Sequence, residues 1–448
     1  MANKTLSELY EAVCSEHEIK INPYILETLQ KTTETGKISL NLRGNDRSRH
    51  GQRISDEDMF SLSKCLQNNP SVTGLDLRYN NVSNEGAGHL ADLIEAGNCA
   101  LRSLNLMFND VQKTGAEDLA GSLKCNSSLL SLRLSGNKIG NRAAEHLARM
   151  LQINETLQEL QLSDCDLVTH APTIHRLLQP LFPLILFIPL SVFLIVLVSL
   201  QATSGVLAFI TVLRNNTVLR CLDISRPLLF SQQEEWTVSF SEMLLVNGSL
   251  VELHLGKVGL TDTGMERLAE GLKQNRSLRY LDLRCNRVAR DGALHLSEVL
   301  KQNPTLEIID LSSNRIEDEG CVYLSEAITW PGCSLKELSV CRNSITSEGL
   351  LSLAQALKTN TTLTHLYIWG NHLKEPLCQA FRELISSGRL QPEHTDVSAY
   401  EVDGHVFLAE VNQSLRKQLF CADGTDALCS SFLSASSRTQ RCSFKTPK

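Results

Sequence analysis

Residues 101–128 read LRSLNLMFNDVQKTGAEDLAGSLKCNSS, and the same pattern begins again at Leu129, 28 residues after Leu101. A step of 28 residues also separates positions 129 and 157, 250 and 278, 278 and 306, and 335 and 363, while 72 and 101, and 306 and 335, are 29 apart. A pattern that returns at a fixed step of this length is typical of solenoids, in which one supersecondary unit is stacked many times.

Each copy contains two periods, one after the other. Leu104 and Leu106 alternate as in a strand, whereas Gly115, Leu119 and Leu123 recur every four residues, as on one face of a helix. Neither apolar face can be buried within a single copy, so the copies must stack. The sequence therefore predicts an α/β solenoid shaped as a horseshoe, with a parallel sheet on its concave side and helices on its convex side.

The pattern predicts eleven strands, one for each copy. They are centred on Leu40, Leu75, Leu104, Leu132, Leu160, Leu222, Leu253, Leu281, Ile309, Leu338 and Leu366. Most copies have an asparagine where the strand ends, and its amide can satisfy backbone groups that the bend leaves unpaired. These turn asparagines are Asn45, Asn80, Asn109, Asn137, Asn286, Asn314, Asn343 and Asn371, while Pro227 and Val258 stand at this position in two copies.

Composition and charge exclude several classes of protein. A net charge of −7 and a pI near 6.0 give no basic footprint for nucleic acid, so no nucleic-acid partner is expected. The first residues lack the apolar core of a secretory signal, and the 14 cysteines form no CxxC pair, which favours a reducing compartment. Sequons such as Asn126-Ser-Ser occur at the end of the repeat helices, and we interpret them as repeat residues rather than glycosylation sites.

Five regions follow from where the repeat holds. Residues 1–37 are expected to form an N-terminal helical cap that opens with a capping box at Thr5 and Glu8. Repeats occupy 38–169 and 204–384, with an insertion at 170–203 between them. Residues 385–448, which lose the repeat after Leu384, are expected to form a C-terminal cap and a disordered tail.

The insertion splits one repeat. Leu219 follows Leu157 at a step of 62 residues, and both halves of the repeat are in register once about 34 are set aside. Residues 181–200 carry no charge over twenty residues, which is the length of a transmembrane helix. Several prolines restrict a helix here, and a span would place the halves of one solenoid on opposite sides of a membrane. Three interpretations of the insertion remain open. It is an alternative or wrongly included stretch of sequence, a membrane anchor, or a packed internal element.

The strand–helix unit of 28 residues resembles the ribonuclease-inhibitor class of leucine-rich repeats over residues 38–384. The resemblance implies a protein-binding solenoid in a cytosolic and nuclear group that includes the inhibitor itself, a GTPase activator and innate immune sensors. At finer grain, VTGLDLRYNNVS at 72–83 and HLYIWGN at 365–371 resemble one family within this class. That likeness implies a place in cytoplasm and nucleus and a role in stem-cell or germ-cell development.

The residues between the strand leucines must face the concave side, and tyrosine, tryptophan and arginine there are the types that most often become binding hot spots. The candidate partner-binding residues are Arg78, Tyr79, Phe108, Arg133, Tyr280, Arg284, Arg342, Tyr367 and Trp369. The same face carries Asp223, His254, Asp282 and Asp310. We expect Tyr367 and Trp369 to be exposed on either side of an inward-facing Ile368.

The sequence contains no GxxxxGK[ST], GxGxxG, HExxH or GxSxG motif, so no catalytic residue, cofactor or metal is predicted. The leading hypothesis is a non-catalytic and monomeric scaffold that binds a protein partner on its concave face. One alternative is a GTPase-activator-like regulator. Another is a membrane-tethered adaptor, which depends on insertion of residues 181–200.

Overall fold

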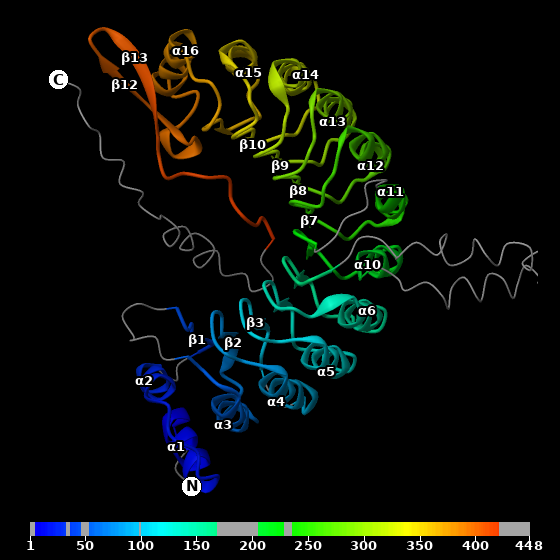
Figure 1. Cartoon of the computed structure of the whole chain (residues 1–448), viewed down its shortest axis with the longest axis vertical. Coiled ribbons are helices and arrows are strands. Elements are labelled where there is room, and N and C mark those ends of the chain that lie inside the picture. Colours follow the sequence, from blue (N-terminus) through cyan, green and yellow to red (C-terminus); the bar gives the residue numbers. More distant parts are fainter. Residues whose placement is uncertain are drawn as a thin grey trace, which may run out of the picture.

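A computed structural model describes residues 5–32, 36–45, 53–97, 100–167, 205–227 and 235–420. Eleven strands form one sheet in chain order (Figure 1), and each strand is parallel to the next. The strands are β1 (Ile38–Asn41), β2 (Val72–Asp76), β3 (Ser103–Asn105), β4 (Ser131–Arg133), β5 (Glu159–Gln161), β6 (Cys221–Asp223), β7 (Glu252–His254), β8 (Tyr280–Asp282), β9 (Ile308–Asp310), β10 (Glu337–Ser339) and β11 (His365–Tyr367). The predicted α/β leucine-rich-repeat solenoid is confirmed.

The register of the sheet is set by the residue at the centre of each strand. Leu75 pairs with Leu40 on one side and Leu104 on the other, and the same row continues strand by strand to Leu338 and Leu366. All eleven predicted centres lie in this row. The alternation inferred from the sequence therefore places every strand on the correct face.

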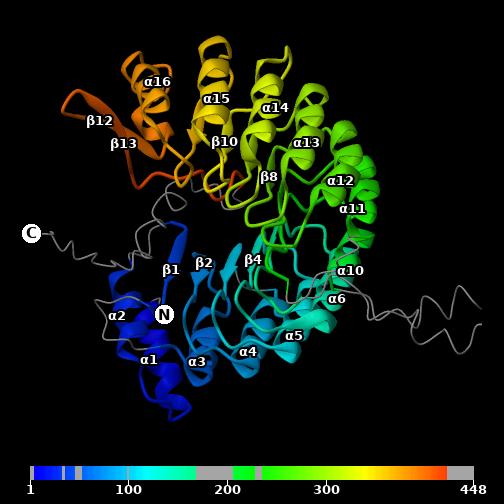
Figure 2. The same cartoon turned by 45° about the horizontal axis from the view of Figure 1, so that its top comes forward.

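Helices cover the convex side of the sheet, and the view in Figure 2 shows them as an outer ring around it. They are α3 (Asp56–Leu66), α4 (Asn84–Glu95), α5 (Lys113–Leu123), α6 (Gly140–Leu151), α10 (Gly205–Leu213), α11 (Glu235–Val246), α12 (Asp262–Gln274), α13 (Arg290–Gln302), α14 (Glu317–Thr329), α15 (Ser347–Thr359) and α16 (Glu375–Ser386). One continuous core fills the space between sheet and helices. Each fully buried leucine in it contributes about 1.5–3 kcal/mol.

The turn asparagines link each repeat to the one before it. Asn109 donates from Nδ2 to the carbonyl oxygens of Leu77 (2.9 Å) and Leu106 (3.0 Å), and its Oδ1 accepts the amide of Val82 at 3.1 Å. Six of the other turn asparagines also donate to backbone carbonyls, whereas Asn45 is exposed. In the repeat of β5, Cys165 stands at this position and donates its thiol to the carbonyl of Leu134 at 3.3 Å. The structural role predicted for the turn asparagines is confirmed at these seven positions.

A second asparagine ladder runs along the ends of the helices. Asn303 donates to the carbonyls of Leu272 (2.7 Å) and Asn275 (2.9 Å), and its Oδ1 accepts the amides of Thr305 and Leu306. Asn126, Asn154, Asn247 and Asn275 are buried in equivalent positions. Their amide nitrogens are occupied, so the folded chain does not offer these sequons for glycosylation.

The two halves of the split repeat lie in register. Leu160 of β5 pairs directly with Leu222 of β6, and the amide of Gly205 donates to Asn141 at 3.1 Å, as Gly115 does to Asn84 at 3.0 Å. Residues 170–203, including the apolar run at 181–200, lie outside the described residues. Among the residues that are described, no helix combines the length and apolarity needed to cross a bilayer.

Both ends of the solenoid are capped. At the N-terminus, α1 (Leu6–Glu16) begins with the predicted capping box between Thr5 and Glu8, and α2 (Pro23–Lys31) precedes β1. At the other end, Arg389 donates to the carbonyls of Leu357, Asn360 and Leu363, where a further repeat would have supplied its asparagine. The carboxylate of Asp396 accepts the amides of Ile368 (2.9 Å) and Trp369 (3.0 Å). Beyond it, η3 (Pro392–His394), β12 (Val397–Val402) and β13 (His405–Glu410) complete the described cap.

Candidate functional site

The concave face divides into two parts, which we call the open half (β1–β5) and the covered half (β6–β11). The two meet at β5, where Gln161 Nε2 donates to Gln418 Oε1 at 3.4 Å. In the covered half, the chain's own residues 411–420, which we call the C-terminal segment, run from the end of β13 into the opening of the horseshoe (Figures 1 and 2). Leu415 of this segment is buried together with Tyr280, Ile308 and Tyr367 in a small cluster separate from the main core.

The open half presents a stacked pair of aromatic rings. The rings of Tyr79 and Phe108 lie 4.7 Å apart at an interplanar angle of 4°, and Phe108 is 42% exposed. Both residues follow the ends of their strands, in the turn immediately before the asparagine, with φ of 62° and 55°. They therefore lie at the edge of the concave face, and their left-handed backbone costs about 1 kcal/mol each relative to glycine.

The left-handed turn is a property of the repeat. Ten successive turns take a positive φ at this position, with glycine at 136 and 370, and with Asp164, Arg226, Lys257, Cys285, Ser313 and Arg342 in the others. Arg342 is exposed and lies at the same edge. The expectation that Tyr79, Phe108 and Arg342 lie between the strand leucines and face the concave side is thus wrong in detail, because the chain has already turned when it reaches them.

The arginines of the open half are paired with carboxylates of the same sheet. Arg78 donates from Nε and Nη2 to Asp76 at 2.9 and 2.7 Å. Arg133 donates from Nε and Nη2 to the fully buried Glu159 at 2.7 and 3.1 Å. Burial raises the pKa of Asp76, but hydrogen bonding to Arg78 and the charges of Arg78 and Arg43 outweigh this effect and lower it overall. Asp76 and Glu159 are therefore both paired with arginines of the open half.

Two of the predicted binding tyrosines are covered. Tyr280 is 1% exposed and Tyr367 is 4% exposed, because the C-terminal segment packs over them. The hydroxyl of Tyr280 donates to the carbonyl oxygen of Arg416 at 2.8 Å. The expectation that these residues are open to solvent is wrong, since side-chain alternation fixes the face of a residue but not what covers that face.

The remaining candidates occupy intermediate environments. Trp369 is half-buried and packs against the main core, so the expectation that it is fully exposed is also wrong. Ile368 is fully buried, as predicted. Arg284 is half-exposed and its Nε lies 3.1 Å from Asp282.

A buried polar network crosses the covered half from β6 to β8. Glu252 Oε1 lies 2.7 Å from His254 Nε2, and His254 Nδ1 lies 3.1 Å from Asp282 Oδ2. Burial lowers the pKa of His254, but hydrogen bonds to Asp282, Cys221 and Glu252 outweigh it and raise the pKa well above its usual value. The imidazole is therefore held as a cation between two carboxylates.

Three residues of this network could also hold a metal ion. The ligand atoms of Cys221, Glu252 and His254 lie within 4.8 Å of one another, and Asp282 on the other ring nitrogen is the usual orienting partner of a metal-bound histidine. A metal would need a thiolate and a neutral imidazole. Burial and the charge of Glu252 raise the pKa of the Cys221 thiol well above its usual value, which also makes it a poor nucleophile. A metal at this site would therefore have to displace protons from Cys221 and His254.

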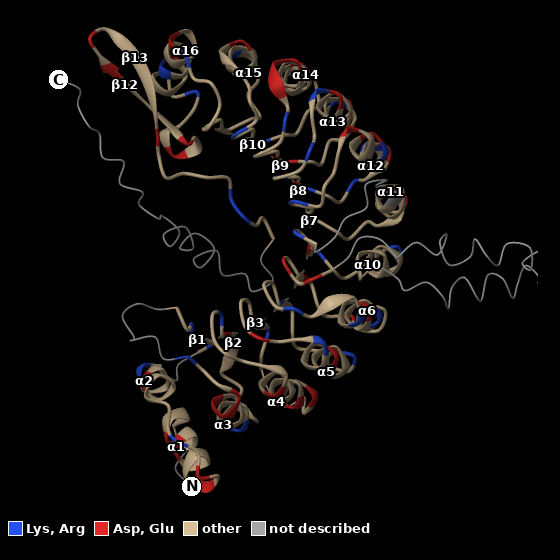
Figure 3. Cartoon of the chain, viewed as in Figure 1, with Lys and Arg blue, Asp and Glu red and all other residues tan. Residues whose placement is uncertain are grey.

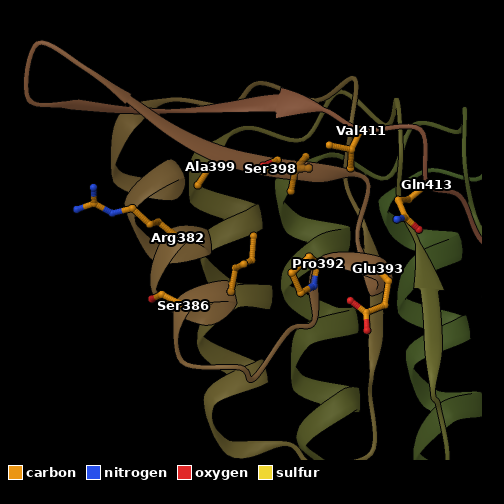
Figure 4. A pocket seen from close by; sticks show the side chains of 10 residues that line it. Arg382, Ser386, Pro392, Glu393, Ser398, Ala399, Val411 and Gln413 are labelled. Carbon is orange, nitrogen blue, oxygen red and sulfur yellow. The ribbon is translucent and has the colours of Figure 1, made fainter.

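A shallow pocket of about 510 Å³ lies at the C-terminal cap, outside the concave face (Figure 4). Its wall includes Ile385 of α16, Pro392 of η3 and Ala399 of β12, together with Val411 and Gln413 at the start of the C-terminal segment. It brings together none of the predicted binding residues.

Two parts of the site were missed from the sequence. The network residues Cys221 and Glu252 face one another in register on neighbouring strands, and counting positions across repeats could have paired them. The C-terminal segment could not be found this way because it lies outside the repeat. Its sequence SLRKQLF, at 414–420, offers only a short run of basic and apolar residues.

Comparisons with known proteins identify the repeat. A family model described as Leucine Rich repeat matches residues 68–91, 97–120, 125–148, 274–297, 302–325 and 333–354. Among solved structures, an internalin from Listeria monocytogenes aligns at 14% identity and a TM-score of 0.40, covering 88% of this chain and 97% of that one. A structure of the yeast Rad7 and Elc1 complex aligns at 15% identity and a TM-score of 0.40, covering 74% of this chain and 76% of that one.

Relatives of much higher identity cover nearly the whole chain. Leucine-rich repeat-containing protein 34 of Mus musculus is 45% identical over 423 residues, which is 93% of this chain and 94% of the relative. The protein of the same name from Homo sapiens is 42% identical over 421 residues, which is 93% of this chain and 83% of the relative. The chain therefore belongs to the leucine-rich repeat-containing protein 34 family.

Proposed function

We propose that this chain is a non-catalytic scaffold that binds a protein partner along its concave face, with the first contact at the edge of the open half. Its membership of the family, and the resemblance on which the sequence interpretation rests, support a place in cytoplasm and nucleus and a role in stem-cell or germ-cell development.

The observation that carries the proposal is the stacked pair of Tyr79 and Phe108. Phe108 is 42% exposed, and neither ring belongs to the main core. Both occupy a left-handed turn position that glycine takes without strain in two other repeats, at Gly136 and Gly370. Large rings kept at a position that disfavours them, exposed and side by side, are best explained by a partner that covers them.

The charges around the pair suit a protein surface. Arg78 lies in the same repeat as Tyr79, and Arg133 ends β4, the strand after that of Phe108. Each arginine is held in a fixed geometry by its carboxylate. Aromatic rings beside rigid arginines match the composition of binding hot spots. Because Arg78 and Arg133 are already paired, they contribute orientation and shape more than free charge.

The test uses two phenylalanines in matched environments. Phe108→Ala should reduce capture of partners from cells that express the chain, measured by quantitative affinity purification and mass spectrometry. Phe407→Ala is the control, since Phe407 is 43% exposed and stacks on Tyr400 in the hairpin formed by β12 and β13. Partners lost with Phe407→Ala but kept with Phe108→Ala would move the binding surface to the hairpin and refute the proposal.

A further inference from the structure

We propose that the covered half of the concave face is a groove for an extended peptide with an apolar residue followed by arginine, and that the C-terminal segment is its internal occupant. This inference rests on the proposed function, because it assumes that the concave face binds proteins. It adds the chemistry of the partner and a competitor built into the chain.

The first element of recognition is an apolar socket. Leu415 is buried against Tyr280, Ile308 and Tyr367, which come from three different strands. Leu419 packs against the same cluster and is partly buried. The socket is made of side chains that project from the sheet, so a peptide can fill it without entering the main core.

The second element is the buried carboxylate of Glu337, whose positively charged partner lies on the C-terminal segment. Glu337 of β10 is only 3% exposed, and its Oε1 lies 2.6 Å from Arg416 Nη2. Burial raises the pKa of Glu337 more than the Arg416 charge lowers it. Its other oxygen, Oε2, is buried and has no hydrogen-bond partner among the described residues. A buried carboxylate in this setting favours a ligand that brings arginine to it.

The third element is a set of hydrogen bonds to the peptide backbone. Glu252 Oε2 accepts the amides of Leu419 and Phe420 at 3.0 and 2.8 Å, while its Oε1 is held by His254. The hydroxyl of Tyr280 donates to the carbonyl of Arg416. These bonds use main-chain groups, so they would hold any extended chain that carries the apolar and arginine anchors in the right places.

The segment is attached in a way that permits exchange. Within the described parts of the chain, the bonds of the segment to the sheet all involve side chains of the sheet, and none joins backbone to backbone. Its anchor belongs to a cluster separate from the main core. Figure 3 shows basic residues, in blue, on the part of the segment that lies in the opening. A partner with the same features would therefore compete for one groove.

The test adds the segment in trans. The probe is a fluorescent peptide with the sequence VNQSLRKQLF (residues 411–420), and its binding is followed by anisotropy. The full chain should bind it weakly, because the internal copy acts at an effective concentration in the millimolar range. The full-length double variant Leu415→Asp/Arg416→Glu should release the internal copy and bind the probe roughly a hundredfold more tightly.

Two further variants locate the probe. Glu337→Gln, added to the released chain, should abolish most of the gain, whereas Glu307→Gln should not, since Glu307 is paired with Arg279 and Lys336. Equal probe binding by the wild-type and released chains, or none by a released chain that still unfolds cooperatively, would overturn the inference. If the double variant does not fold, Arg416→Gln alone should give a smaller gain, and no gain would count against the groove.

The two proposals fail separately. Phe108→Ala should leave probe binding unchanged, because Phe108 lies at the edge of the open half, whereas the C-terminal segment bonds to residues of β5–β10 and packs on the cluster of Tyr280, Ile308 and Tyr367. Probe binding without any effect of Phe108 on partner capture would support the groove and remove the aromatic edge from the proposed function. Loss of partner capture with Phe108→Ala, without probe binding by the released chain, would support the proposed function and refute the groove.

Discussion

The open and covered halves of the concave face are made from the same repeat and differ in how their buried charges are satisfied. In the open half, Glu159 is paired with Arg133 from the neighbouring strand. In the covered half, Glu337 is paired with Arg416 and Glu252 accepts two amides, all from the C-terminal segment. A sheet that neutralises its own carboxylates can stay open to solvent. One that leaves Glu337 and one oxygen of Glu252 for another chain segment is built to be occupied.

The largest expected difference between the halves concerns two tyrosines. Tyr280→Ala should lower the free energy of unfolding by about 3–5 kcal/mol, as for other large buried side chains, because it empties the socket and removes a hydrogen bond. Tyr79→Ala should cost less than about 1 kcal/mol, because its ring lies at the partly exposed edge. Urea unfolding of both variants measures this contrast. Equal losses would mean that the open half is as covered as the other.

The asparagine ladder should not distinguish the halves. Asn109→Ala and Asn314→Ala each leave two carbonyls of buried leucines without the side-chain donor, so each should cost about 2–3 kcal/mol. The same urea experiment applies. A large difference between the two variants would show that the halves differ in their framework as well as in their surface.

A pH titration should reveal the buried histidine of the covered half. The folded pKa of His254 is raised well above the unfolded value of about 6.5, so its stabilising effect is complete below that pH and is lost as the pH rises through the folded pKa. Between these values the free energy of unfolding should fall by up to about 1.4 kcal/mol per pH unit. His254→Gln should lack this slope. An unchanged slope in the variant would show that other groups cause it.

The smallest expected effect on stability is that of Phe108→Ala in the open half. Its ring contributes stacking at an exposed edge, so the melting temperature should change little and the free energy of unfolding by about 0.5 kcal/mol or less. Differential scanning calorimetry would detect a larger change. A marked loss of stability would mean that the pair is a structural element, and the evidence for a binding edge would be weakened.

The framework of the fold was predictable because it depends on spacing. The row of strand centres from Leu40 to Leu366 follows from one alternation repeated at a fixed step, and the turn asparagines follow from their place after it. The left-handed turn was not predictable, because residues as different as Gly136, Ser313 and Phe108 occupy it. The backbone there is imposed by the stacking of repeats and not by the residue.

The candidate site was predictable only in part. Alternation placed Tyr280 on the concave side. The carbonyl oxygen that accepts its hydroxyl there belongs to Arg416, which is 136 residues away in the sequence. A contact over that separation leaves no local pattern, and the segment that makes it belongs to no repeat. The sequence therefore predicted which residues lie on the concave face, but it did not predict that the C-terminal segment covers one half of that face.

Hydrogen exchange of the C-terminal segment tests the occupied groove most directly. The amides of Leu419 and Phe420, which donate to Glu252, should exchange slowly in the full chain and quickly in the Leu415→Asp/Arg416→Glu variant, with the amides of β7 and β8 protected in both. Fast exchange at residues 419 and 420 in the unmodified chain would contradict the account, because the groove would then be empty and its carboxylates exposed to solvent.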